Sequence, residues 1–113
     1  MPHVIVEYTD NLGDDARIPQ LLETINATLI AQNGVFPTGG IRSRAIKLTE
    51  YRVADGKEDD AFVHVTMKIG AGRSAEVKKA ACDALFEAIK VHFADAFAKR
   101  YLALSMELTG MLE

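Results

Sequence analysis

The order of the secondary-structure patterns limits what this chain of 113 residues can fold into more than any other feature. Residues 3–8 are dominated by β-favouring side chains and predict a short strand. Apolar residues at steps of three and four then predict a helix that begins at about Pro19 and is stopped by Asn33-Gly34. A second strand is expected near residues 41–53, so the first half has the order strand, helix, strand.

The second half repeats this order. Residues 61–69 alternate between two faces and predict a third strand, after a polar stretch in which the Asp55-Gly56 pair predicts a hairpin-type turn. Ser74 is a good N-cap for a helix whose pattern continues to Lys99. Residues 101–108 predict the last strand.

Two successive strand-helix-strand units predict a single α+β domain over residues 1–113, with a four-stranded sheet and two helices on one face. The other sheet face carries Ile5, Phe62 and Thr66, which are not polar enough to face open water. We therefore expect copies of the chain to associate through that face. His64 lies on the same face, where we expect it to form hydrogen bonds in the interface rather than to act in catalysis.

The composition argues against several classes of partner and site. A formal net charge of −3 argues against nucleic acid as a partner. No stretch approaches the roughly 20 apolar residues of a membrane span, and no signal-like segment opens the chain, so we expect a cytoplasmic protein without a membrane partner. The single cysteine excludes an internal disulfide. The histidines lack the spacing of metal ligands, so we expect no metal site. No Ser-His-Asp or Cys-His arrangement is evident.

The chain opens with Met1-Pro2, directly ahead of the first predicted strand. A methionine before a small residue is normally removed, which would leave the secondary amine of Pro2 at the tip of that strand. An α-amino group has a pKa of about 7.7–8.0, and burial or a nearby cation lowers this pKa further. A neutral amine near pH 7 can act as a general base. While Met1 remains attached, the same nitrogen is an amide and cannot do so.

Three arginines follow glycines in the sequence and are candidates for binding a carboxylated ligand. Arg42 and Arg44 come soon after a pair of glycines, and Arg73 follows a Gly-Ala-Gly segment at the start of the second predicted helix. Glycine lets a backbone approach a ligand closely, and a guanidinium matches the geometry of a carboxylate. Arg73 also lies at a helix N-terminus, where backbone amides favour anions. We expect Arg42 and Arg44 to share one strand face.

Several segments resemble the tautomerase superfamily, whose members begin at a proline after methionine removal and are built from β-α-β units. Within it, the chain is similar to the family of 5-carboxymethyl-2-hydroxymuconate isomerases. The segments that carry this resemblance run through essentially the whole chain, at residues 1–7, 40–44, 54–56, 61–64, 68–74 and 102–105. Members of the family continue past the last strand in a tail that can contribute to a subunit contact, whereas this chain stops at Glu113.

The resemblance implies a cofactor-free isomerase, assembled as a homotrimer, in the breakdown of homoprotocatechuate, which derives from 4-hydroxyphenylacetate. Pro2 would take the proton of the 2-hydroxyl of a dienol, 5-carboxymethyl-2-hydroxymuconate, and return a proton to carbon as the conjugated ketone forms. Arg42 and Arg73 would bind carboxylates and polarise the developing oxyanion. Arg44 is a weaker candidate, with an ion pair across the interface as its alternative role. The sequence does not decide which subunit supplies Arg73 to a site.

Two other functions stay open. One is a different tautomerase reaction on carboxylated enols, of the 4-oxalocrotonate or phenylpyruvate type, with the same Pro2 amine. Activity on mono-, di- and tricarboxylate enols distinguishes this reading from the first. The other is a non-catalytic trimeric binding protein that keeps the fold while its N-terminus stays blocked, which retained Met1 in protein from the native host would favour.

Overall fold

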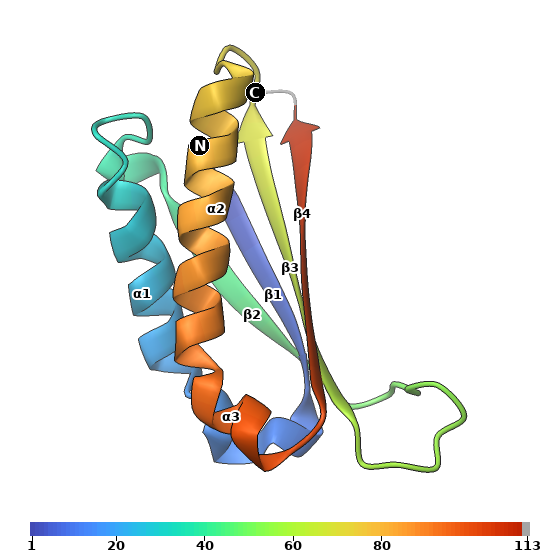
Figure 1. Ribbon diagram of the computed structural model, residues 1–113. Coiled ribbons are helices and arrows are strands. Elements are labelled where there is room, and N and C mark those ends of the chain that lie inside the picture. Colours follow the sequence, from blue (N-terminus) through green and yellow to red (C-terminus); the bar gives the residue numbers. More distant parts are fainter. Residues whose placement is uncertain (112–113) are drawn as a thin grey trace.

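The fold consists of four strands and their connecting helices (Figure 1). A computed structural model describes residues 1–111; residues 112–113, which the expected domain of residues 1–113 includes, lie outside the described part. The elements in chain order are β1 (His3–Thr9), the short helix η1 (Asp10–Ala16), α1 (Ile18–Ile30), the short helix η2 (Thr38–Gly40), β2 (Arg42–Leu48), β3 (Ala61–Gly70), α2 (Ala75–His92), α3 (Ala94–Lys99) and β4 (Leu102–Met111).

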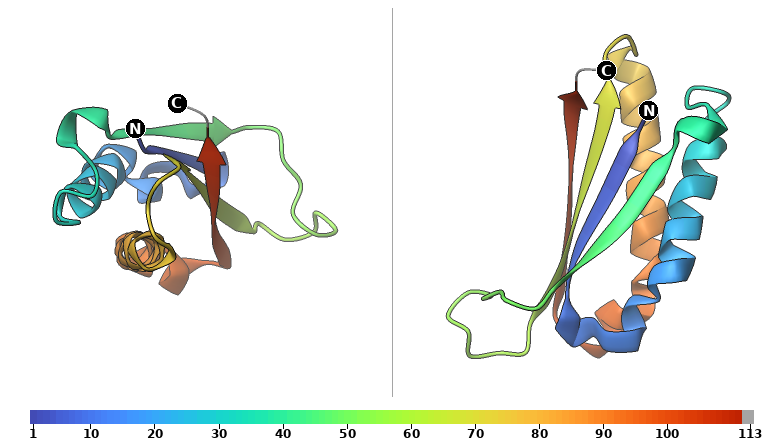
Figure 2. Two further views of the ribbon diagram at one scale, coloured as in Figure 1. Left: turned by 90° about the horizontal axis from the view of Figure 1, so that it is seen from above. Right: turned by 180° about the vertical axis from the view of Figure 1, so that it is seen from behind.

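The four strands form one mixed sheet in the order β2-β1-β3-β4. Each half of the chain contributes a parallel pair, β1 with β2 and β3 with β4, joined by a helix that crosses over one face. The two halves meet where β1 and β3 run antiparallel in the centre. Helices α1 and α2 lie side by side on one face (Figures 1 and 2), which confirms the predicted α+β class and the two-helix layer.

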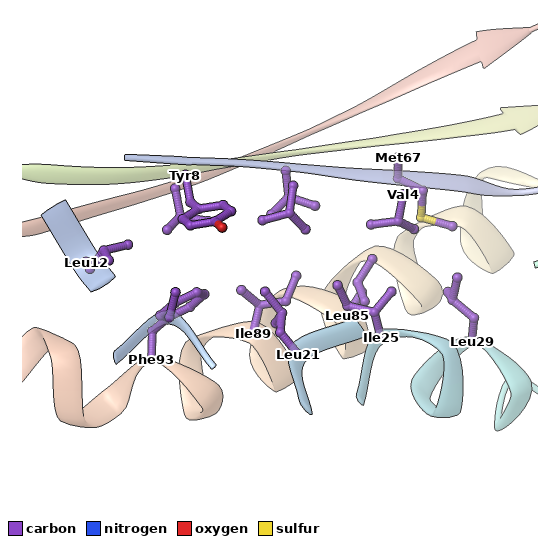
Figure 3. Close-up of a cluster of buried hydrophobic side chains, with 14 of the residues drawn as sticks. Val4, Tyr8, Leu12, Leu21, Ile25, Leu29, Met67, Leu85, Ile89 and Phe93 are labelled. Carbon is purple, nitrogen blue, oxygen red and sulfur yellow. The ribbon is translucent and has the colours of Figure 1, made fainter. Parts of the chain in front are cut away.

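The core lies between the sheet and this helix layer (Figure 3). Successive side chains of a strand point to opposite faces, so Val4 and Val6 are buried while His3 and Ile5 lie on the open face. Helical residues four positions apart share a face, which buries one stripe of α1. The side chains that meet there include Val4, Val6, Val63, Val65 and Met67 from the sheet, Leu21, Ile25 and Leu29 from α1, and Leu85 and Ile89 from α2.

The second strand is shorter than predicted. The sequence pattern predicts a strand over residues 41–53, but β2 ends at Leu48. Its partner β1 ends at Thr9, directly opposite Leu48, so residues beyond 48 have no strand to pair with. They form the loop that extends away from the body in Figure 1. Because β1 lies between β2 and β3, the Asp55-Gly56 turn belongs to this loop and does not form a hairpin.

The second long helix is interrupted, which the sequence pattern does not predict. Instead of one helix up to Lys99, α2 ends at His92 and α3 begins at Ala94, with the buried Phe93 between them. The Arg17 guanidinium donates a hydrogen bond to the His92 carbonyl, which a continuous helix would use internally. At its other end, α2 begins as predicted, since Ser74 Oγ accepts a hydrogen bond from the Val77 N–H at 3.2 Å.

Two further elements agree with the predictions to within three residues at their ends. Helix α1 begins at Ile18 with Pro19 in its first turn, as expected, and ends at Ile30 ahead of the left-handed Asn33 and Gly34. Strand β4 continues to Met111 rather than residue 108 because it pairs with β3 along its whole length.

Buried His92 makes the stability depend on pH. Its Nε2 donates a hydrogen bond to the Ala16 carbonyl at 2.8 Å. Burial lowers the pKa of His92 from its ordinary 6.5; the hydrogen bond to Ala16 opposes this shift, and Arg17 adds to it. The unfolded chain therefore binds a proton at higher pH than the folded protein, and the free energy of unfolding decreases as the pH falls below about 6.5.

We expect His92→Gln, which keeps an N–H donor but does not titrate, to reduce this loss of stability. Denaturant unfolding of both proteins at pH 7.5 and pH 5.5 measures the difference. An equal decrease in the two proteins would show that other groups cause the pH dependence.

Candidate active site

Pro2 is buried where the sheet begins, one residue before β1. Its carbonyl accepts a hydrogen bond from the Arg42 N–H at 3.0 Å, which continues the pairing of β1 with β2. Met1 lies against η2, since a Cβ added to Gly40 would be 3.4 Å from Met1 Cγ. The backbone on both sides of the Pro2 nitrogen is therefore held against the start of β2.

Arg42 and Arg44 lie on the open face of the sheet, in one row. In the β1–β2 register, His3 is opposite Arg42 and Ile5 is opposite Arg44. Arg42 bends back toward η2, where its Nη1 donates to the Gly39 carbonyl at 2.9 Å. Arg44 has a different partner, because its Nη1 lies 3.0 Å from His3 Nδ1. Both guanidinium groups are thus held next to the residues that surround Pro2.

Arg73 lies in the connection between β3 and α2. Its guanidinium lies over the ring of the buried Phe36, with 4.9 Å between Cζ and the ring centroid. It also donates to the Val35 carbonyl at 3.3 Å and to the Gly70 carbonyl at 3.4 Å. These contacts fix a half-buried arginine between the loop after α1 and the end of β3.

Chain direction brings these residues to one end of the molecule. Strands β1 and β2 begin at this end, and the antiparallel β3 finishes there before α2 starts (Figure 2). Pro2, Arg42 and Arg73 therefore share an end of the sheet, although they are spread over 71 positions of sequence, from 2 to 73. Arg44 lies one pleat further into the open face.

A cavity of about 440 Å³ lies at the opposite end, near the C-terminal ends of β1 and β2. Tyr8, Arg17 and Lys47 line it together with the carboxylates of Asp10 and Asp14. Its lining holds charges of both signs and none of the predicted site residues. The residues predicted from the sequence to act in catalysis and binding therefore lie at the rim of the sheet and do not line this cavity.

Sequence reasoning missed a hydrogen-bonded Ser-His-Glu group on the open face. His64 Nδ1 lies 2.7 Å from Ser105 Oγ, and His64 Nε2 donates to Glu107 Oε1 at 2.9 Å. Thr66 donates to the same carboxylate oxygen at 3.2 Å. These hydrogen bonds lower the pKa of the Glu107 carboxyl, and the bond from His64 has a larger effect than the bond from Thr66. The β3–β4 register puts His64 opposite Ser105, and no local pattern indicates a pair 41 positions apart.

Two kinds of feature are absent from residues 1–111. Within that range, no three His, Cys, Asp or Glu side chains cluster so that they could hold a metal ion. In the same described part, no helix is both long and apolar enough to span a membrane.

Comparison with solved structures identifies the class of this fold. A structure described as a fused 4-OT wild-type symmetric trimer superimposes with a TM-score of 0.66 at 19% identity, covering 90% of this chain and 82% of that one. The four-stranded mixed sheet with its helix layer is the fold of the tautomerase superfamily.

Closer relatives identify the family. The family model for 5-carboxymethyl-2-hydroxymuconate isomerase matches residues 2–113. A 5-carboxymethyl-2-hydroxymuconate Delta-isomerase from Escherichia coli is 50% identical over 108 residues, which are 96% of this chain and 85% of that protein. The crystal structure of a 5-carboxymethyl-2-hydroxymuconate isomerase from Deinococcus radiodurans R1 has a TM-score of 0.93 at 53% identity, covering 98% of this chain and 83% of that one. The chain belongs to this family and is an isomerase.

Proposed function

We propose that this chain converts the dienol 5-carboxymethyl-2-hydroxymuconate into its conjugated ketone, with the Pro2 amine as acid and base and without a cofactor. The reaction belongs to the degradation of homoprotocatechuate, derived from 4-hydroxyphenylacetate, in the cytoplasm. The observation that carries the proposal is the buried position of Pro2 at the tip of β1, bonded through its carbonyl to Arg42. Membership of an isomerase family supports the substrate.

The reaction needs one group that accepts a proton and returns it. Once Met1 is removed, the Pro2 nitrogen has a lone pair and takes the proton of the 2-hydroxyl. The electrons of the O–H bond form the C=O bond of the ketone, and the double bonds shift along the carbon chain of the substrate. The carbon at the far end of the shifted double bonds takes a proton from the prolinium. The number of protons is unchanged, so no other reactant is required. Nearby cations disfavour the prolinium and keep the free amine available near pH 7.

Arg42 and Arg73 supply positive charge for the carboxylates and for the oxygen on which charge develops. Preorganised cations stabilise such charge most where water is partly excluded. Arg73 is half-buried over Phe36, and Arg42 lies beside the backbone of Pro2. Arg44 is the third candidate, and it lies further along the same face as Arg42.

We expect Arg73→Ala to raise the KM for the carboxylated dienol by about tenfold or more, since a charge-assisted bond contributes roughly 1.5–3 kcal/mol. Steady-state kinetics measure this effect. Arg52→Ala is the matched control: Arg52 also donates to a backbone carbonyl, that of Asp55 at 2.7 Å, but it lies in the loop after β2 at the opposite end. Unchanged kinetics in Arg73→Ala would remove this residue from the site.

The open sheet face supports assembly into a homotrimer of single domains that each span residues 1–113. Ile5 and Phe62 are only half-buried there, and Ile46 is 46% exposed. A face of this composition is stabilised when copies of the chain cover it. A related fold is described as a symmetric trimer, which agrees with this assembly.

The state of the N-terminus tests the function without changing a side chain. Protein that retains Met1, identified by intact mass, is treated with methionine aminopeptidase and assayed for ketonisation of 5-carboxymethyl-2-hydroxymuconate. We expect turnover to appear in step with the loss of Met1, because only then is the Pro2 nitrogen an amine. Turnover limited to phenylpyruvate- or 4-oxalocrotonate-type enols would indicate another tautomerase. No turnover of any enol after Met1 removal would favour a binding protein.

A further inference from the structure

His3 lies at the centre of a cationic cluster on the open face, directly after Pro2. We define the His3 cluster as His3, Arg42, Arg44 and Lys68. Arg42 is opposite His3 on β2, and Lys68 is opposite His3 on β3. Side chains opposite each other on neighbouring strands lie about 5 Å apart at Cβ, so His3 has Arg42 on one side and Lys68 on the other. Arg44 contacts its ring directly. In a chain of net charge −3, this places a local positive field beside the proposed base.

The hydrogen bond between His3 and Arg44 can have only one direction. An arginine carries only N–H donors and stays protonated, so His3 Nδ1, which lies 3.0 Å from Arg44 Nη1, must be the acceptor. In this bond Nδ1 therefore carries no proton. The bond uses one of the five N–H donors of Arg44, and among residues 1–111 the others have no hydrogen-bond partner.

The two arginines of the cluster are held in different ways. Arg42 donates to the Gly39 carbonyl, a main-chain group of its own loop. Arg44 is exposed and has a side-chain partner, so its orientation depends on His3. A guanidinium held at one nitrogen still presents a planar edge with two parallel donors, which matches a carboxylate. Residues two apart on a strand are about 6.8 Å apart, so Arg42 and Arg44 present two separate anion-binding groups.

Resting on the proposed function, we propose that His3 is a positioning residue that holds Arg44 for a second substrate carboxylate. His3 thereby determines the preference of the site for enols with several carboxylates over those with one. His3 does not touch the reacting atoms in this role. Its removal should weaken the binding of the distal carboxylate and leave proton transfer at Pro2 unchanged.

Kinetics with two substrates test this role. We expect His3→Leu to raise the KM for 5-carboxymethyl-2-hydroxymuconate by about tenfold, to change kcat by less than about twofold, and to leave the kinetics with the enol of phenylpyruvate, a monocarboxylate, unchanged. His3→Asn keeps an acceptor near the position of Nδ1 and should restore most of the lost binding. In the double variant with Arg44→Leu, His3→Leu should have no further effect. His64→Leu, on the same face, is the matched control for removal of a histidine.

A binding measurement separates this proposal from the proposed function. Calorimetry with adipate and hexanoate, which do not react, compares a dicarboxylate with a monocarboxylate on protein of verified mass and oligomeric state. We expect wild type to bind adipate more tightly, and His3→Leu to abolish that preference. Equal binding of the two acids by wild type, or an unchanged preference in His3→Leu, would overturn the role of His3. A retained preference for adipate in protein that turns over no enol would instead refute the proposed function alone.

Discussion

Replacing Pro2 with alanine is expected to lower kcat by about two orders of magnitude and to leave the fold intact. General acid–base catalysis contributes roughly 10²–10⁴-fold, and alanine retains an amine but not the rigid ring, so the loss should lie at the lower end of this range. Pro2 precedes β1 and contributes only its carbonyl to the sheet, where it accepts from the Arg42 N–H, and alanine keeps that carbonyl. Steady-state kinetics on protein of verified mass measure the effect.

The control for this variant is a comparison of far-UV circular dichroism and of the denaturant midpoint, both of which should match wild type. The pH profile of kcat/KM provides a second readout, since the group that titrates in the free enzyme should differ between a secondary and a primary amine. An unchanged kcat in a correctly processed and folded Pro2→Ala protein would remove Pro2 from the mechanism.

The largest expected loss of stability is for Phe93→Ala, at about 3–5 kcal/mol in the free energy of unfolding. Phe93 is 0% exposed and separates α2 from α3, with its ring edge-on to His92 at 4.8 Å. Truncation would leave a cavity where both helices meet the core. The hydrogen bond from the Arg17 guanidinium to the His92 carbonyl restricts how far the backbone can collapse into this cavity. Urea unfolding at matched protein concentration measures the change.

Phe97→Ala is the matched control, because Phe97 lies four residues later on α3 and is 40% exposed. Its partial burial predicts a loss of only about 1 kcal/mol. Equal losses in the free energy of unfolding for the two variants would show that Phe93 is not the packing centre between α2 and α3 that its burial indicates. A normal fold with a much lower midpoint in Phe93→Ala would agree with the prediction.

The sequence predicts most of the elements because their signals are local. The alternation of residues 61–69 matches β3, the four-residue spacing from Leu21 to Leu29 matches the buried stripe of α1, and Ser74 caps α2. Each of these patterns depends on the period of a strand or helix, or on a cap within one turn. Two successive strand-helix-strand units leave few ways to bury the apolar faces of both helices, and packing them on one face of a sheet is one of these. This is why the predicted α+β class is correct.

The candidate site is predictable in part for the same reason. Pro2 and the arginines after glycines stand out by residue type and local context, and Pro2, Arg42 and Arg73 do lie at one end of the sheet. His3 and Lys68 carry no such signal. They become relevant only through the register, which puts His3 opposite Arg42 on one side and opposite Lys68 on the other.

The sequence by itself therefore determined the order of the elements, the core-facing positions and the candidate base, because local periodicity and residue chemistry specify them. Only the tertiary structure decided where β2 ends, since that depends on the length of β1, and where the last long helix breaks, since Arg17 reaches a carbonyl 75 positions away. It also decided the pairs His3–Arg44 and His64–Ser105, each 41 positions apart. Such contacts exist only once the sheet is assembled, because its register, and no local pattern, brings their partners together.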